Sequence, residues 1–452
     1  MNKKTMTLAL VAGMGMMSSC SQQLKSGIDL KNLDTEVKVG EDFYQYATGG
    51  WQKANPLTAE YSRFGSFDVL QENNNKDLRD IIEEVAGKEN KAGSIEQKIA
   101  SLYNSAMDSV KLNERGMQDL AAFLACDGYQ SEEGLANQWL ESVWPRMQRQ
   151  GVSGMFGFYI TADEKDAKNN ALYIVQGGLT LGQKDYYVDQ DEDTKKIREA
   201  YKKYIADLSK HVGFSEEDAQ RISEDVMRIE TILAENSKSM TELRDPEANY
   251  NKLTYAELKE QFAGINWDAY FQNFGISGLK EVIFGQPNAI HAAEQLLNTE
   301  PAEAIQNYYL WHAINMAADY IDDDSRAIAF AFWGKVMSGK QEDRPRWKRA
   351  VESVEDGLGE ALGQLYVAKH FPPAAKERMV QLVKNLQVAL GQRIDEQDWM
   401  SDETKKVAHG KLDAFYVKVG YPDTWTDYSA LEIGDSYLNN ILACNEWSIK
   451  DN

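Results

Sequence analysis

The chain has 452 residues, of which 43% are hydrophobic and 27% charged, values that are ordinary for a globular protein with a packed core. Its net charge of −22 leaves no excess of Lys and Arg to bind phosphate groups, which argues against a nucleic-acid partner. Three cysteines are too few for a disulfide-built scaffold or for a zinc module with several cysteine ligands.

The N-terminal residues have the pattern of an export signal. Lys3 and Lys4 precede a short apolar run over 8–17 that is too brief to span a bilayer. Small residues then lead to Cys20, in the sequence MSSC, which resembles the cleavage box of bacterial lipoproteins. We therefore expect removal of residues 1–19 and a lipid on Cys20 that anchors the protein to the cell envelope, outside the cytoplasm on the periplasmic or outer-membrane face. The alternative is an ordinary secretory signal that contains a cysteine by chance.

Two further cysteines, Cys126 and Cys444, would lie in an oxidising compartment in the exported protein. They either pair or are buried singly, and the sequence does not decide between these states. No later stretch is apolar enough to cross a membrane, so the acyl group is the only membrane attachment that we expect.

Helical periodicity dominates the rest of the chain. Apolar residues spaced at i, i+3, i+4 and i+7 predict helices that include 78–85, 222–233 and 379–390, and Gly87 is expected to end the first. Because such stripes usually pack inward, we expect all three to face the core.

A β element interrupts the helical pattern. Two runs rich in aromatic and β-branched residues, 155–161 and 171–176, flank a charged stretch and predict a β-hairpin. We find no internal repeat and no long linker. The sequence therefore predicts a mainly α fold with a small β-hairpin element.

The histidines give no metal-binding motif. No helix can carry two of them at positions i and i+4, so HExxH and its inverted form do not occur. The five are His211, His291, His312, His370 and His409. The HxxE spacing of His291 and Glu294 is commonplace on helices, and we interpret it as structural.

Two other stretches resemble ligand-binding loops without their essential residues. The sequence GKVMSGK over 334–340 resembles a phosphate loop, but Gln341 stands where a Ser or Thr would bind magnesium. The acidic run 189–193 resembles a calcium loop that lacks the required glycine and the bidentate glutamate. Composition and spacing alone therefore predict no catalytic residue.

A different pattern lies between residues 27 and 74. We expect the aromatic residues of 43–46 to pack on one face, the glycines at 49–50 to turn the chain, and Pro56 to fix the entry to a helix that starts near Phe67. The stretch resembles the N-terminal signature of the neprilysin-like zinc metallopeptidases, the family of endothelin-converting enzyme and of bacterial secreted oligopeptidases.

Further segments are similar to those of the family and follow in its order. They are 181–187 (LGQKDYY), 229–231, 244–246, 250–251, 344–347 (RPRW), 359–366, 399–400, 404–405 and 420–423 (GYPD). The resemblance covers essentially all of 27–425.

The resemblance implies a zinc endopeptidase that cuts small peptides in a closed chamber between two largely helical lobes. In the family, zinc is bound by an HExxH helix and a downstream glutamate, and a VNAYY-type motif holds the peptide backbone. Neither motif occurs in this chain, so it offers no catalytic and no zinc-binding residue by resemblance. The sequence NALY at 170–173 resembles the second motif only superficially, because it lies in the wrong part of the order.

The zinc-binding region of the family follows the segment that matches 420–423. We therefore expect this chain to be a truncated N-terminal portion of a zinc-dependent metalloendopeptidase, inactive alone, with oligopeptides as substrates. The alternatives are a non-catalytic peptide-binding remnant and a glycan-binding surface lipoprotein. The sequence leaves the oligomeric state open.

The resemblance also implies a division into domains. After the signal peptide, residues 20–75 would be the anchor and the N-terminal segment of the catalytic lobe. Residues 76–410 would form a helical substrate-gating lobe, and 411–452 would begin the rest of the catalytic lobe.

Arg63 is the substrate-binding residue that the resemblance implies. In mammalian members the matching arginine binds the free C-terminal carboxylate of a substrate, a task for which the planar guanidinium is well suited. A second arginine of those members falls on Gln71 here. The alternative is that Arg63 pairs with a carboxylate such as Asp68 or simply faces solvent.

Overall fold

The computed structural model describes residues 27–125 and 143–451. These described residues form two compact units, which divide between Thr58 and Ala59. Within the described residues, no helix combines the length and the apolar character needed to cross a membrane.

The first unit contains a short 3₁₀ helix, η1 (Leu30–Asn32), and the helix α1 (Phe43–Ala54). The carboxylate of Asp42 caps α1 by accepting a hydrogen bond from the backbone N–H of Gln45. The expected packing of residues 43–46 on one face is wrong for the first two of them, since Phe43 is 68% exposed and Tyr44 70% exposed.

The expected turn at residues 49–50 is also wrong, because α1 continues through both glycines. A Cβ atom on Gly49 would lie 2.7 Å from the Cβ of Asp34, and one on Gly50 would lie 2.2 Å from the carbonyl oxygen of Lys31. The two glycines therefore allow the segment before α1 to approach the helix closely, which is a use of glycine other than turning the chain.

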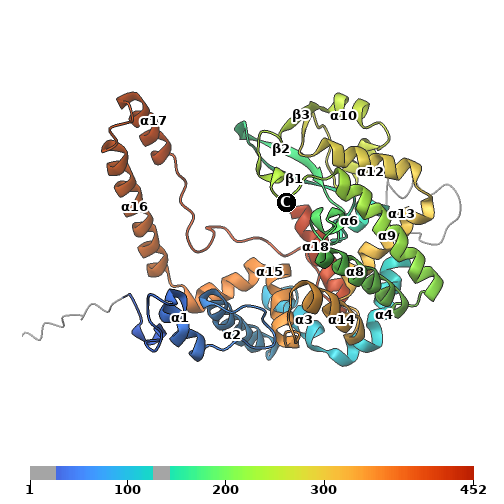
Figure 1. The fold of residues 1–452 in the computed structure, drawn as a ribbon, viewed down its shortest axis with the longest axis horizontal. Helices are drawn as coiled ribbons and strands as arrows, with labels where there is room; N and C mark the ends of the chain where they lie inside the picture. Colours follow the sequence, from blue (N-terminus) through green and yellow to red (C-terminus); the bar gives the residue numbers. More distant parts are fainter. Residues whose placement is uncertain (1–26, 126–142, 452) are drawn as a thin grey trace, which may run out of the picture. The chain divides into compact units, whose positions relative to one another are not determined.

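Helices dominate the described part of the second unit (Figure 1). Its first half contains α2 (Ser66–Ala86), α3 (Ile95–Met107), α4 (Ser109–Ala125), α6 (Trp144–Arg149), α7 (Asp185–Val188), α8 (Glu192–His211), α9 (Glu216–Asn236) and the 3₁₀ helix η3 (Glu242–Arg244). Its second half contains α10 (Tyr255–Gln261), α11 (Trp267–Gln272), α12 (Pro287–Thr299), α13 (Ala302–Ala317), α14 (Asp323–Ala329), the π-helix η4 (Phe330–Met337), α15 (Arg346–His370), α16 (Pro373–Asp395), α17 (Asp402–Asp413) and α18 (Tyr437–Asp451). The prediction of a mainly α fold is confirmed.

A small mixed sheet completes the fold. Its strands are β1 (Phe156–Asp163), β2 (Asp166–Gln176), β3 (Asn251–Thr254) and β4 (Glu281–Phe284), arranged in the order β1-β2-β4-β3. β1 and β2 form the predicted antiparallel hairpin, in which Phe156 lies opposite Gln176. β4 runs parallel to β2 and antiparallel to β3. The sequence predicted the hairpin but not the two short strands that widen it.

Two of the three predicted apolar stripes face the core. In α2, Leu78, Ile81, Ile82 and Val85 are at most 9% exposed, and Gly87 caps the helix C-terminus as expected. The stripe of α9, over residues 222–233, is also buried. Helix α2 begins at Ser66, one residue before the predicted start.

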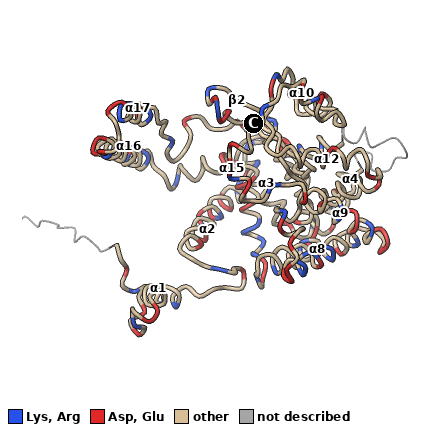
Figure 2. Tube along the Cα trace, turned by 45° about the horizontal axis from the view of Figure 1, so that its top comes forward, with Lys and Arg blue, Asp and Glu red and all other residues tan. Residues whose placement is uncertain are grey.

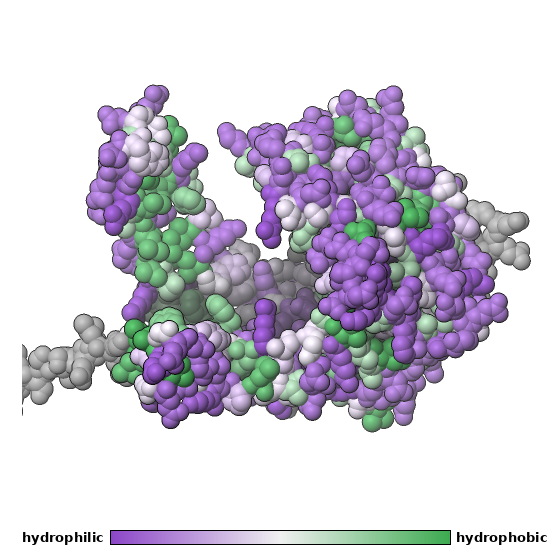
Figure 3. Space-filling model, viewed as in Figure 1, coloured by the Kyte–Doolittle hydropathy of each residue, from purple (hydrophilic) through white to green (hydrophobic). Residues whose placement is uncertain are grey.

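The third stripe is on the surface, contrary to the prediction. In α16, Met379 is 42% exposed, Leu382 48% and Leu386 61%, and apolar side chains are visible along this helix in Figure 3. α16 contacts α17, with which it forms a helical hairpin (Figure 1). The periodicity therefore predicted an amphipathic helix correctly, but periodicity does not indicate what covers its apolar face.

The core of the second unit is rich in aromatic residues. Trp144, fully buried, contacts Phe156, Tyr270 and Tyr309, with ring centroids 4.6 to 5.7 Å apart. A separate buried cluster joins α2, α3, α15 and α18. This second cluster is important for the candidate site because it fixes α2 against α15.

The two stretches that resemble ligand-binding loops have structural roles. The residues of GKVMSGK begin in η4, so they form no loop after a strand. Asp191 caps α8 by accepting hydrogen bonds from the backbone N–H groups of Asp193 and Thr194. Along α8, basic and acidic residues are interspersed (Figure 2), and Lys195, Lys196 and Lys202 each pair with a carboxylate three residues earlier.

Candidate functional site

Arg63 lies on a short irregular segment, residues 59–65, that leads into α2. At one end of the segment, the carbonyl oxygen of Ala59 accepts hydrogen bonds from the backbone N–H groups of Gln341 and Glu342. At the other end, the N–H of Gly65, the N-cap residue of α2, donates to the carboxylate of Asp68 at 2.7 Å, which is the one half of a capping box that glycine allows. The backbone on both sides of Arg63 is therefore fixed by hydrogen bonds.

The guanidinium of Arg63 is exposed, and among the described residues no hydrogen bond or ion pair reaches it. Asp68, the suggested alternative partner, is bonded to Gly65 instead. Gln71, which replaces the second arginine, donates to Asn75 at 2.9 Å. Phe67 lies four residues beyond Arg63 and is 84% exposed. The segment therefore presents a cation whose hydrogen-bond donors are free among the described residues, and an exposed aromatic residue follows it in sequence.

Lys348 of α15 pairs with two carboxylates from either side of Arg63. Its ammonium lies 2.9 Å from both oxygens of Glu60 and 2.6 Å from Glu72. The Tyr61 hydroxyl donates to the same oxygen of Glu72. Burial raises the pKa of Glu72, but the hydrogen bonds from Lys348 and Tyr61 outweigh it and hold this pKa below its usual value. Glu72 is therefore ionised at neutral pH and holds both donors.

A second polar cluster joins two of the segments that carry the family resemblance. Glu230, fully buried in α9, accepts hydrogen bonds from the hydroxyls of Thr180 at 2.6 Å, Tyr187 at 2.6 Å and Tyr201 at 3.1 Å. His312 Nε2 lies 3.1 Å from the same carboxylate but is not aligned for a hydrogen bond. The segment 181–187 and helix α9 thus meet at one buried carboxylate, and its full set of partners indicates a structural role.

The described residues do not fit a zinc ion. They contain no group of three or more His, Cys, Asp or Glu side chains placed to hold a metal. Each histidine lies against a different residue: His211 against Asp322, His291 against Glu294, His312 against Glu230, His409 against Asp395, and His370 stacked on Tyr366. The sequence NALY at 170–173, which resembled a peptide-holding motif, lies within β2.

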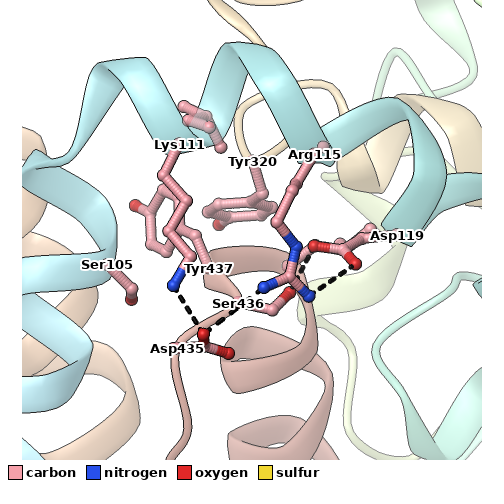
Figure 4. Close-up of a pocket in the computed structure, with 11 residues that line it drawn as sticks. Ser105, Lys111, Arg115, Asp119, Tyr320, Asp435, Ser436 and Tyr437 are labelled. Atoms are coloured by element: carbon pink, nitrogen blue, oxygen red, sulfur yellow. Dashed lines mark hydrogen bonds and ion pairs between the residues drawn. The ribbon is translucent and has the colours of Figure 1, made fainter.

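A small pocket between α4 and the start of α18 is lined by charged side chains (Figure 4). Lys111 and Arg115 both contact Asp435, at 2.5 and 3.3 Å, and Arg115 also contacts Asp119 at 3.6 Å. With a volume of about 10 Å³, the pocket holds at most one water molecule. Because its two cations already face two carboxylates, we do not interpret it as an anion site.

Of the three cysteines discussed above, only Cys444 lies among the described residues. Cys20, the predicted lipidation site, and Cys126 lie outside them. Cys444 is a buried free thiol in α18, and burial raises its pKa to about 11.

Comparison with known proteins identifies the family. Residues 39–422 match the model of peptidase family M13. The chain belongs to peptidase family M13. It is 27% identical over 430 residues to human endothelin-converting enzyme 1, covering 91% of this chain and 55% of that protein. It is 26% identical over 439 residues to mouse endothelin-converting enzyme-like 1, covering 93% of this chain and 56% of that protein.

Two solved bacterial structures share the fold. The Mycobacterium tuberculosis zinc metalloprotease ZMP1, solved with an inhibitor, superposes with a TM-score of 0.85 at 31% identity, over 94% of this chain and 64% of that one. PepO of Lactobacillus rhamnosis superposes with a TM-score of 0.77 at 19% identity, over 92% of this chain and 66% of that one, and supports the fold alone. This M13 chain thus spans a little over half the length of the relatives that it matches and about two thirds of these structures.

Sequence reasoning missed Lys348 and Glu230 in this M13 chain. Lys348 lies three residues before Val351, so a helical reading places it on the buried face of α15. A lysine on a buried face is rare unless it is paired, and that is the signal that could have found it. Glu230 gives the same signal, since it directly follows Ile229 in an apolar stripe.

Proposed function

We propose that this chain is the part of a zinc-dependent M13 metalloendopeptidase that binds the C-terminal end of oligopeptide substrates. Membership of family M13 supports the substrate class, and the structural relative ZMP1 is a zinc metalloprotease. The residue that we propose for the task is Arg63, which binds the free carboxylate of the peptide.

One observation carries this proposal: the guanidinium of Arg63 is exposed while the carboxylates around it are engaged elsewhere. Glu60 and Glu72 face Lys348, and Asp68 caps α2. Arg63 therefore keeps its full set of donors for a ligand, and a carboxylate is the group that fits a planar fork of N–H donors.

The chemical step of peptide hydrolysis is not assigned to these residues. The described residues offer no zinc site, and the HExxH motif does not occur in the 452 residues. In our proposal this chain alone binds peptides without cleaving them. The predicted domain boundaries, at residues 19, 75 and 410, stay predictions.

Peptide binding by the full chain tests the proposal. Two N-terminally fluorescein-labelled pentapeptides of identical sequence are titrated by anisotropy, one ending in a free carboxylate and the other in an amide. A hydrogen bond to a charged group contributes about 1.5–3 kcal/mol, so Arg63→Ala should weaken binding of the acid roughly ten- to hundredfold. Binding of the amide should change little.

The matched control is Arg221→Ala, which removes an exposed arginine of α9 that pairs with Asp218 and Glu303 at the surface. This variant should bind both peptides as the wild-type chain does. Equal affinity of the wild-type chain for acid and amide would contradict the assignment of Arg63.

We further propose that Cys20 is acylated and tethers the protein to the cell envelope. The support is the basic start, the short apolar run and the MSSC sequence at the N-terminus. The variant Cys20→Ala should leave the membrane fraction, and its persistence there would refute the anchor.

A further inference from the structure

Lys348 holds the segment that presents Arg63 on both sides of that residue. Glu60 precedes Arg63 and Glu72 follows it on α2, and the single ammonium of Lys348 contacts both carboxylates at 2.6 to 2.9 Å. Lys348 itself lies on α15. One buried cation therefore joins the start of the 59–65 segment, through Glu60, and the helix that follows it, through Glu72, to a helix that is distant in sequence.

The cluster joins two helices at the cost of desolvating three charged groups. Lys348 is 5% exposed, and the side chains of Glu60 and Glu72 are 21% and 19% exposed, so all three charges lose much of their hydration. Apolar side chains of similar volume often stabilise such a position at least as well as a buried ion pair. Unlike apolar packing, the charged groups fix the relative geometry of their partners, because each hydrogen bond constrains where its partner can lie.

The geometry around Tyr61 reinforces this constraint. The Tyr61 ring lies 5.7 Å from the Lys348 ammonium and 5.0 Å from the ring of Phe64, and its hydroxyl donates to Glu72. Tyr61 and Phe64 flank Arg63 closely in sequence. The backbone of Arg63 is thus fixed through its neighbours, although no hydrogen bond or ion pair holds its own side chain among the described residues.

We propose that Lys348 is a positioning residue for carboxylate binding by Arg63. It holds Glu60 and Glu72, and through them the 59–65 segment, so that the guanidinium meets the peptide carboxylate in bidentate geometry. This inference rests on the proposed function of Arg63.

The same pair of pentapeptides tests it on the full chain. Lys348→Met should reduce the preference for acid over amide by about three- to tenfold, because misplacement of a binding group weakens only the contact that it makes. Affinity for the amide should stay within about twofold of wild type. Lys348→Arg keeps the positive charge and offers N–H donors to both carboxylates, and should restore most of the preference.

The matched control is Lys369→Met. Lys369 also lies on α15 and also pairs with a glutamate of α2, Glu84, but both side chains are exposed and lie near the other ends of the two helices. Its loss should leave the preference unchanged. If Lys348→Met fails to fold by circular dichroism, Glu60→Ala takes its place, because it removes the contact between Lys348 and the 59–65 segment and leaves the ammonium paired with Glu72.

The outcomes separate this inference from the proposed function. Loss of the preference in Arg63→Ala with full preference in Lys348→Met, or in Glu60→Ala where that replaces it, would overturn the positioning role alone. Equal losses for acid and amide in the Lys348 variant would overturn it too, since they indicate general damage. A wild-type chain without any preference would overturn both.

Discussion

The Glu230→Gln variant should unfold more easily than the wild-type protein, because the buried carboxylate is the shared acceptor of three hydroxyl donors. Thr180 and Tyr187 donate at 2.6 Å and Tyr201 at 3.1 Å, and Glu230 is fully buried. Water cannot replace any of these bonds when the acceptor changes. The amide of glutamine keeps one oxygen but replaces the other with a donor that faces the same hydroxyls.

The size of the effect follows from the number of bonds. A hydrogen bond to a charged group contributes about 1.5–3 kcal/mol, and one between neutral groups about 0.5–1.5 kcal/mol. Replacing the charged acceptor with a neutral one in three hydrogen bonds should therefore lower the free energy of unfolding by roughly 3 kcal/mol. A neutral amide is easier to bury than a carboxylate, and this offsets part of the loss. Tyr187→Phe removes one of the three bonds and should cost about 1.5–3 kcal/mol.

Urea unfolding followed by tryptophan fluorescence measures these losses. The matched control is Glu235→Gln, an exposed glutamate of the same helix, α9, which should change the free energy of unfolding by less than about 0.5 kcal/mol. A Glu230→Gln protein that is as stable as the control would refute the reasoning. It would mean that the desolvation of the carboxylate cancels its three hydrogen bonds.

Three further predictions concern other sites. The purified chain should contain no stoichiometric zinc by elemental analysis, since the described residues offer no ligand set; one zinc per chain would contradict this. Gly357→Ala should destabilise the protein by about 1–3 kcal/mol in thermal melts, because the added Cβ would lie 2.8 Å from the sulfur of Cys444. In the control Gly359→Ala, the added Cβ would meet no neighbouring element within 4 Å, so this variant should be neutral or stabilising. Burial raises the pKa of Asp343, but the interaction with Arg326 is stronger and holds this pKa below its usual value. The ionised Asp343 therefore stabilises the fold fully above about pH 3.9, its usual pKa, and this stabilisation is lost as the pH falls through the lower pKa of the folded state. The difference in the free energy of unfolding between wild type and Asp343→Asn should therefore decrease as the pH is lowered. A difference that stays constant from pH 7 to pH 3 would refute the assignment.

Local patterns in the sequence predicted local structure well. The stripe at 78–85 gave helix α2 and its end at Gly87, and the runs at 155–161 and 171–176 gave the β1–β2 hairpin. In these cases the residues that decide the structure are close in sequence, so periodicity and turn residues suffice.

Predictions failed where distant segments decide the structure. The glycines at 49–50 suit a turn, but they lie inside α1 because residues 31–34 approach that helix. The stripe of α16 predicts an amphipathic helix and does not reveal its exposure. The Glu230 cluster draws on residues from 180 to 312, and no spacing in the sequence indicates that these side chains meet.

The candidate site was predicted only through family resemblance. Nothing in composition or spacing distinguishes Arg63 from other arginines, and the resemblance alone drew attention to it. The contacts of Lys348 with Glu60 and Glu72 span more than 270 residues of sequence, so they could not be foreseen from local pattern.

A structure of the full chain bound to the free-acid pentapeptide tests the central claim most directly. We predict that the C-terminal carboxylate of the peptide accepts two hydrogen bonds from the Arg63 guanidinium, at about 2.7–2.9 Å. Lys348 should keep its contacts with Glu60 and Glu72 in that complex. A peptide whose carboxylate binds elsewhere, with Arg63 still facing solvent, would contradict the account.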